Sequence, residues 1–265
     1  AAYQRAVTIS PKTPEIHHNI GNVLKESGQD EQAIAAFRKA LALGSSHPAT
    51  QHALAALTGA AAETAPRAVV RDLFDDYAER FDSHLTGELS YQTPRHLRAL
   101  HGDAPISRLL DLGCGTGLSA EAFSDIASHL TGVDLSPKML ARARAKGLYA
   151  ELAESDLLDF LRQAAPPYDL VIAADVFVYI GDLSTVIAAI AARLAAGGAV
   201  LFSVERHDGE GDFVLQPSER FAHTDAYIDR CAADAGLTVA ARQQKQLRRD
   251  GERWIEGTLY KLQRA

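Results

Sequence analysis

The chain has 265 residues, of which 47% are hydrophobic and 23% are charged, enough apolar material for one large packed domain or two smaller ones. Its formal net charge is −7 and its Lys and Arg residues are scattered, which disfavours a nucleic-acid partner. With only Cys114 and Cys231 and no apolar stretch long enough to span a membrane, we expect a soluble, cytoplasmic protein without a disulfide framework, a metal or a membrane partner.

The first part of the chain contains a repeat with an offset of 34 residues. Four positions recur in this way: Tyr3, Ala6, Ile9 and Pro11 reappear as Phe37, Ala40, Leu43 and Ser45. This period, with Gly21 in one helix and Ala33 in the next, resembles the tetratricopeptide repeat, in which small residues let two antiparallel helices pack closely. We therefore predict a tetratricopeptide-like segment over residues 1–62, with Gly28 ending its first complete helix; an unrelated Ala-rich helical hairpin is the alternative. Because the chain begins without Met in what looks like a helix, we expect the native chain to extend N-terminally.

Residues 63–104 are predicted to form a linker and a helical lid. Pro and small residues at 59–68 are typical of a linker. Phe74, Tyr77 and Phe81 follow at helical spacing, and Tyr91 lies further along. We expect Tyr77, Phe81 and Tyr91 to line a ligand site, although plain core packing explains the aromatic residues at least as well.

From residue 106 onward, strand and helix patterns alternate, which predicts a parallel sheet covered on both faces. The predicted strands are 108–112, 130–134, 149–154, 170–174 and 199–204, and the predicted helices are 118–128, 136–146, 155–164 and 183–196. A further helix at 225–235 precedes two strands at 238–247 and 254–262, joined through Asp250 and Gly251 as a hairpin. An antiparallel pair therefore ends the sheet.

Three glycines follow the first predicted strand, in the sequence Gly113-Cys114-Gly115-Thr116-Gly117. Glycines at the carboxyl end of a strand permit positive φ and let a ligand lie against the main chain. The spacing is GxGxG without a following Lys-Ser or Lys-Thr, so a ligand without pyrophosphate fits better than a nucleotide triphosphate or a dinucleotide.

Two acidic residues near the ends of the next strands extend this candidate site. Asp134 ends the second strand, where a carboxylate can accept both hydroxyls of a ribose; starting the next helix is its alternative role. Asp156 follows the third strand, where it can accept from an adenine amino group; capping the next helix is the competing explanation.

These motifs, "LLDLGCGTG", "GVDLSP", "ESDLLD", "YDLVIAADVFVYIGDL" and "LAAGGAVLFSVE", resemble the class I S-adenosylmethionine-dependent methyltransferases over about residues 105–205. With the preceding repeats, the chain looks like the bacterial repeat-containing predicted methyltransferases. The resemblance implies an α/β, Rossmann-like domain over 105–265 with strand order 3-2-1-4-5-7-6, strand 7 antiparallel, and S-adenosylmethionine as cofactor. It implies cofactor contacts for Asp111, Gly113, Cys114, Gly115, Asp134, Leu135, Asp156, Leu157, Asp175 and Val176.

Residues for the methyl acceptor are expected after the fourth and fifth strands. His223 and Tyr179 are candidate catalytic residues, with a helix-start role and a buried structural role as their alternatives. Arg220 and Phe177 are candidate substrate contacts, Arg220 by pairing with a carboxylate. The fourth strand is followed by Ala174-Asp175-Val176-Phe177, without the Pro-Pro-Tyr loop of nucleobase methylation, which disfavours a nucleobase.

Three functions stay open at this point. The leading hypothesis is methylation of a small molecule, with the repeats packing on the catalytic domain or mediating assembly. The second is methylation of a protein that the repeats recruit. The third is a scaffold that keeps the fold without catalysis.

Overall fold

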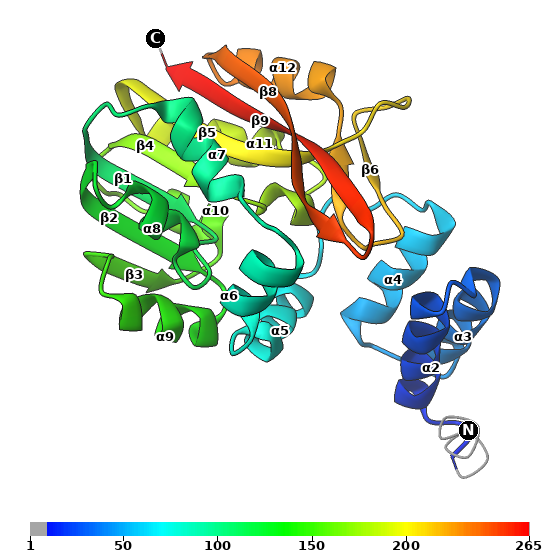
Figure 1. The fold of residues 1–265 in the computed structure, drawn as a ribbon. Coiled ribbons are helices and arrows are strands. Elements are labelled where there is room, and N and C mark those ends of the chain that lie inside the picture. The colour runs from blue at the N-terminus through cyan, green and yellow to red at the C-terminus, as the bar shows by residue number, and fades with distance from the viewer. Residues whose placement is uncertain (1–9, 265) are drawn as a thin grey trace. The chain divides into compact units, whose positions relative to one another are not determined.

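The computed structural model describes residues 10–264 and divides the chain into two compact units (Figure 1). The first unit comprises the described part of Ala1–Val69 together with Leu215–Arg220, and the second comprises Val70–Val214 with Phe221–Ala265 up to residue 264. The predicted boundaries at residues 62 and 104 stay predictions. Among the described residues, every helix is too short or too polar to cross a bilayer.

In the described part of the first unit the helices are α2 (Pro14–Glu26), α3 (Asp30–Ala42) and α4 (Pro48–Thr58). α2 ends just before Gly28, whose φ of 69° only glycine adopts readily. A methyl group on Gly21 would lie 2.5 Å from the ring of the fully buried Phe37. This close approach is why a small residue is needed where α2 crosses α3. The earlier half of the predicted 34-residue repeat, at residues 3–9, lies outside the described residues.

A segment from late in the chain belongs to this helical unit. His52 Nε2 donates to the carbonyl oxygen of Glu219 at 3.1 Å, and the Lys25 ammonium pairs with the Glu219 carboxylate. Leu215–Arg220 therefore joins the first unit although about 150 residues separate it from α4.

The segment predicted as a lid forms several short helices. These are α5 (Arg67–Tyr77), α6 (Phe81–Ser83), the π-helical turn η1 (His84–Glu88) and α7 (Thr93–His101). Pro94 occupies the start of α7, where its missing N–H costs nothing.

The second unit is dominated by a mixed sheet whose main strands follow the order β3-β2-β1-β4-β5-β9-β8. The strands are β1 (Ile106–Leu112), β2 (Ala127–Asp134), β3 (Glu151–Glu154), β4 (Tyr168–Ala173), β5 (Leu194–Arg206), β8 (Leu237–Asp250) and β9 (Arg253–Arg264). β1 to β5 are parallel, and β9 runs antiparallel to β5 and β8. This arrangement confirms the predicted order, with β8 and β9 in the places of the sixth and seventh strands.

Helices cover both faces of this sheet (Figure 1). One apolar cluster packs β4 and β5 against α10 (Leu157–Leu161), α11 (Ser184–Arg193) and α12 (Asp225–Asp234). A second cluster packs β1 and β5 against α7 and α8 (Leu118–Phe123). The remaining helix, α9 (Pro137–Lys146), begins after β2 with Ser136 as its cap.

Two short strands and a turn were not predicted. β6 (Phe213–Leu215) and β7 (Phe221–His223) follow β5, and β7 pairs in parallel with the last two residues of β5. The turn η2 (Phe177–Tyr179) follows β4. Each contains only three residues, too few for a periodic pattern to be detected.

Candidate cofactor and acceptor site

The glycine loop lies where β1 ends, at the carboxyl edge of the parallel strands. Gly113 and Gly115 have φ values of 63° and 53°, in the left-handed region that side chains with a Cβ rarely adopt. A Cβ on Gly113 would also lie 2.6 Å from Cγ2 of Val176. The loop is anchored to the neighbouring strand, because the Cys114 N–H donates to the carbonyl oxygen of Val133 at 3.0 Å. The main chain is therefore held in a shape that other residues would disrupt.

Asp111 contributes an unusual buried carboxylate directly beneath this loop. It is 1% exposed, and the Tyr149 hydroxyl donates to its Oδ2 at 2.6 Å. Its Oδ1 has no hydrogen-bond partner among the described residues. Burial raises the pKa of Asp111 to about 7; the Tyr149 hydrogen bond acts in the opposite direction, and the charge of Asp134 adds to the rise.

Asp134 ties the glycine loop to the end of β2. Its Oδ2 accepts from the Gly115 N–H and its Oδ1 from the Ser136 N–H, both at 2.8 Å. Burial raises the pKa of Asp134 in spite of these hydrogen bonds. Each carboxylate oxygen can accept a further hydrogen bond, so the predicted contact with two ribose hydroxyls is compatible with this geometry. The adjacent Leu135 is half-buried.

Asp156 caps α10, which is the alternative that the sequence left open. Its Oδ1 accepts from the N–H of Leu158 at 2.9 Å and from that of Asp159 at 3.3 Å. Leu157 is half-buried and packs at the edge of the larger apolar cluster. The cap fixes the carboxylate at the end of β3, and its contact with adenine stays a prediction.

Acidic side chains of α5 and α6 hold the predicted lid against the start of α9 and the glycine loop. Asp75 Oδ1 accepts from the Ser136 hydroxyl at 2.5 Å. Asp82 accepts from the Thr116 hydroxyl and pairs with Lys146 at 2.8 Å. Asp75 and Asp82 were not predicted from the sequence, although acidic residues close to the aromatic residues of the predicted lid were a usable signal.

The aromatic residues of this segment divide between two environments. The Phe81 ring lies 3.8 Å from the position of a Cβ on Gly115, so it covers the loop. Tyr77 packs edge-on against Phe81, with 5.1 Å between ring centroids, and its hydroxyl bonds the His84 ring. Tyr91 is buried near Asp175, and burial together with the charge of Asp175 raises the pKa of its hydroxyl well above the ordinary value.

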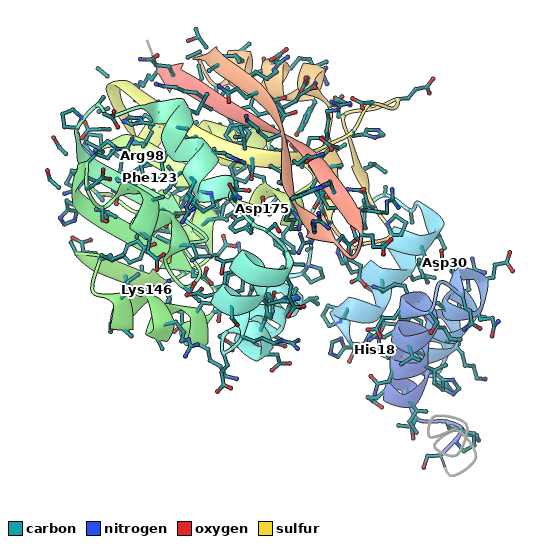
Figure 2. All side chains as sticks on the ribbon, viewed as in Figure 1. His18, Asp30, Arg98, Phe123, Lys146 and Asp175 are labelled. Atoms are coloured by element: carbon teal, nitrogen blue, oxygen red, sulfur yellow. The ribbon has the colours of Figure 1, made fainter. Side chains whose placement is uncertain are left out.

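The residues after β4 approach the loop from the other side. Asp175, labelled in Figure 2, has a positive φ of 57° and donates its N–H to Ser203 Oγ at 2.9 Å. Val176 touches the glycine loop as described. Phe177 is fully buried, with its ring centroid 5.0 Å from that of Phe202, so it supports this wall from within the core. Its predicted contact with a substrate stays a prediction.

Two other acceptor candidates, Tyr179 and His223, have different surroundings. Tyr179 is half-buried, and its ring meets Phe74 edge-on at 5.6 Å between centroids. His223 is completely buried, and its Nε2 donates to the carbonyl oxygens of Ile180 and Gly181 at 2.9 and 3.0 Å. Burial lowers the pKa of His223 to about 4, against the effect of those carbonyls. These bonds fasten β7 to the turn after β4, a structural role; the predicted catalytic role of His223 stays untested.

Arg220 belongs to the segment Leu215–Arg220, which is part of the first unit. The other predicted acceptor residues belong to the second unit. The pairing of Arg220 with a substrate carboxylate stays a prediction.

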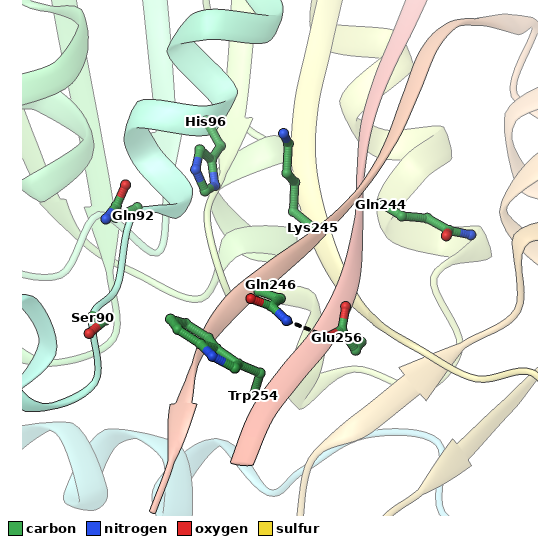
Figure 3. A pocket seen from close by; sticks show the side chains of 8 residues that line it. All are labelled: Ser90, Gln92, His96, Gln244, Lys245, Gln246, Trp254 and Glu256. Atoms are coloured by element: carbon green, nitrogen blue, oxygen red, sulfur yellow. Dashed lines mark hydrogen bonds between the residues drawn. The ribbon is translucent and has the colours of Figure 1, made fainter. Parts of the chain in front are cut away.

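A separate pocket of about 390 Å³ lies between the start of α7 and the far half of the β8–β9 hairpin (Figure 3). Polar side chains surround the indole of Trp254, and Gln246 donates to Glu256 at 3.0 Å. The lining residues are Ser90, Gln92, His96, Gln244, Lys245, Gln246, Trp254 and Glu256. No predicted site residue is among them.

Two segments of the chain match models of known protein families. Residues 109–198 match the family model described as "Methyltransferase domain", and residues 14–47 match "Tetratricopeptide repeat". Residues 109–198 form a methyltransferase domain of the class I fold. The resemblance predicted from the sequence is thus confirmed for this domain and for the repeat.

Curated relatives of the methyltransferase domain include two ubiquinone biosynthesis O-methyltransferases. That of Bordetella avium (strain 197N) is 32% identical over 159 residues, which cover 56% of this chain and 65% of the relative. That of Aromatoleum aromaticum (strain DSM 19018 / LMG 30748 / EbN1) is 33% identical over 100 residues, covering 36% of this chain and 43% of the relative. The chain therefore spans less than two thirds of the length of either relative.

Solved structures share the fold of the methyltransferase domain. Magnesium protoporphyrin IX methyltransferase from Synechocystis PCC 6803, with bound SAH, superposes with a TM-score of 0.58 at 18% identity, covering 75% of this chain and 99% of that one. The 1,6-didemethyltoxoflavin-N1-methyltransferase of Burkholderia thailandensis superposes with a TM-score of 0.59 at 20% identity, covering 75% and 88%. At these identities the likeness establishes the fold.

Proposed function

We propose that the protein is an S-adenosylmethionine-dependent methyltransferase that acts on a small-molecule acceptor. The observation that carries the proposal is the site at the end of β1, where a glycine loop with positive φ values lies between the carboxylates of Asp111 and Asp134. The unpaired, buried Oδ1 of Asp111 is an acceptor that a ligand ammonium group would satisfy.

The cofactor would supply an activated methyl group bound to a sulfonium, with a thioether as an excellent leaving group. The residues of the chain then have three tasks. Asp134 and Asp156 bind the nucleoside, the glycine loop lets the ligand lie against the main chain, and Phe81 with the short helices excludes water. We assign Tyr179 to the alignment of the acceptor. Methyl transfer needs no catalytic base when the acceptor is already nucleophilic.

The named relatives support a small acceptor, because the curated matches are enzymes of ubiquinone biosynthesis. The helical repeat supports the second candidate, a protein acceptor recruited through the first unit, because such repeats form concave binding surfaces. Only one repeat is matched, so the groove it offers is short.

The test is transfer of an isotopically labelled methyl group from S-adenosylmethionine into two fractions of a bacterial extract, small molecules and proteins. We expect label in the small-molecule fraction, and much less with the Asp134→Ala variant at a cofactor concentration below its weakened dissociation constant. Label confined to the protein fraction would support recruitment by the repeats. Cofactor binding without labelling of either fraction would support the scaffold hypothesis.

A further inference from the structure

The pocket between the start of α7 and the β8–β9 hairpin has two walls that are firmly joined. One wall is the segment that leads into α7, and the other is the far half of the hairpin. The Arg249 N–H donates to the carbonyl oxygen of Leu89 at 2.8 Å, which links the two main chains. Leu97 and Leu247, both fully buried, pack in the same apolar cluster. The pocket is therefore preformed, as small-molecule sites usually are.

A β-bulge shapes the hairpin wall. The pairing of β8 with β9 shifts between Gln246 and Arg248, and a bulge bends its strand and increases the local twist. The consecutive residues Lys245 and Gln246 both line the pocket, although successive residues of a regular strand face opposite sides. The irregular pairing thus brings two neighbouring polar side chains to one space.

The opposite wall contains a residue with an uncommon backbone conformation. Ser90 has a φ of 51°, in the left-handed region that residues other than glycine rarely adopt. The residues on both sides of it are fixed, Leu89 by the bond from Arg249 and Tyr91 by its N–H, which donates to the carbonyl oxygen of Leu85 at 2.9 Å. Such conformations cost free energy and gather at ligand sites, where the surrounding structure holds them.

Lys245 brings an unpaired positive charge to the pocket. Its side chain is half-buried, and within the described range the ammonium has no carboxylate partner. His96 lies close to it, because burial and then the charge of Lys245 lower the pKa of the imidazole, which is therefore uncharged near neutral pH. The Nδ1 atom of His96 is buried and has no hydrogen-bond partner in the same part of the chain. This end of the pocket has a donor without the acceptor that an ammonium ordinarily finds.

The indole of Trp254 forms another part of the pocket. Arg249, its partner across the hairpin, stacks on the ring with 4.9 Å between its Cζ atom and the ring centroid. This contact holds the ring in place, and the indole lines the pocket. The Lys245 and His96 side chains lie together, and the indole lies apart from them (Figure 3). The pocket therefore has a cationic end and an aromatic end.

Glu256 limits the charge that a ligand can carry. Its carboxylate accepts from the Gln246 amide at 3.0 Å and lies apart from the Lys245 ammonium (Figure 3). Since the pocket holds one ammonium and one carboxylate, a second negative charge on the ligand would be repelled. A volume of about 390 Å³ accommodates a small ring system. A singly charged carboxylate on a planar ring fits this pocket better than a phosphate dianion.

We propose that this pocket is a second ligand site, and that its ligand is a planar aromatic carboxylate. Lys245 pairs with the carboxylate, and Trp254 packs against the ring. Ser90 and His96 line the pocket and offer further polar groups to the ligand. No residue assigned to the cofactor or to the methyl acceptor lines the pocket, so the inference goes beyond the proposed function and does not depend on it.

The experiment uses Trp254 as the reporter, because it is the only tryptophan of the chain. The full chain, labelled with nitrogen-15 at tryptophan, is titrated with benzoate while NMR follows the single indole N–H signal. We expect a saturable shift with a dissociation constant on the order of 1 mM, as for other very small ligands. Benzamide lacks the charge and acetate lacks the ring, so each should bind at least roughly fivefold more weakly.

Three variants test the charge of Lys245. Lys245→Gln should weaken benzoate binding roughly fivefold to twentyfold and leave benzamide binding within about twofold of wild type. Lys245→Arg keeps the positive charge, and Lys261→Gln removes a charge on β9 outside the pocket. We expect both to bind benzoate within about threefold of wild type.

The outcomes that would overturn the inference are distinct. An indole signal that does not move at tens of millimolar benzoate would show that the pocket takes no such ligand. Equal affinities for benzoate and benzamide, or for benzoate and acetate, would show that the charge or the ring is not recognised. Unchanged benzoate binding by Lys245→Gln, or an equal loss in Lys261→Gln, would exclude pairing with Lys245.

The comparison of the three probes on the wild-type chain needs no variant, so it decides the question even where a variant fails to fold. The titrations contain no S-adenosylmethionine. Each negative result would therefore leave the proposed function standing, and a failure of the proposed function would leave this site untouched.

Discussion

Asp111 shows most clearly how a single residue of this site departs from ordinary behaviour. Its pKa of about 7 lies above the usual value because the carboxylate is buried with one oxygen unpaired. A group whose pKa is raised on folding makes the protein more stable at low pH. This added stability is complete below the pKa of the unfolded state, and it is lost as the pH rises through the pKa of the folded state. For Asp111 this window runs from about pH 4 to pH 7.

Replacing Asp111 with Asn should therefore change how stability depends on pH. The free energy of unfolding of Asp111→Asn, relative to wild type, should increase by roughly 2 to 3 kcal/mol between pH 5 and pH 8, because the variant has no charge to bury. Urea denaturation at both pH values measures this difference. A constant difference across the range would contradict the raised pKa.

Asp134 should be the strongest single determinant of cofactor affinity. Asp134→Ala removes a charged acceptor and should weaken S-adenosylmethionine binding by roughly 1.5 to 3 kcal/mol, about tenfold or more in the dissociation constant. The control is Glu154→Ala, an exposed carboxylate on β3 that pairs in register with Asp134. Equal affinities of the two variants, measured by calorimetry, would refute the assignment to ribose.

Among the elements, the glycine loop combines two constraints that can be separated. Gly113→Ala meets both a positive φ and a contact of 2.6 Å with Val176, whereas Gly147→Ala meets a positive φ with open space around it. Gly147→Ala should cost about 1 kcal/mol. Gly113→Ala should cost roughly 1 to 3 kcal/mol more because of overpacking. Thermal unfolding of the two variants compares them, and similar melting temperatures would show that the loop moves freely away from Val176.

The helical lid depends on a few polar contacts, so it should open without global unfolding. Asp82→Asn removes the ion pair with Lys146 and weakens the bond with Thr116. Amide hydrogen exchange should then become faster over residues 70–90 while β1 and β4 stay protected. Unchanged exchange in the lid would mean that Phe81 and its aromatic neighbours hold it without these acids.

Elements differed in how well the sequence predicted them. The parallel strands were predictable because long apolar runs alternate with amphipathic helices, and the glycine loop was predictable from its spacing. The order of the strands was expected only from the resemblance to the methyltransferase family. The burial of Arg248 on β8 was not predictable. It depends on a bulge at Leu247 that shifts the register between β8 and β9, and no single-strand pattern shows such a bulge. The role of Asp156 as a helix cap was foreseen only as an alternative.

At the scale of the whole molecule, the chain combines a methyltransferase domain with a helical unit that includes the late segment Leu215–Arg220. Sequence patterns separate domains by position along the chain, so they could not assign this segment to the repeat. His52 and Lys25 contact Glu219, and these contacts depend on tertiary structure alone.

Cofactor binding should be insensitive to damage within the repeat. Gly21→Ala would force a methyl group against the Phe37 ring. It should destabilise the packing of α2 on α3 by roughly 1 to 3 kcal/mol. Its affinity for S-adenosylmethionine should stay within twofold of wild type. A large loss of affinity would show that the first unit takes part in the cofactor site.

The most direct test is a calorimetric titration of the full chain with S-adenosylmethionine. We predict one site per chain, with binding that Asp134→Ala weakens and Glu154→Ala does not. Absence of binding at millimolar ligand, or equal binding to Asp134→Ala, would contradict the claim that the glycine loop and its flanking carboxylates bind this cofactor.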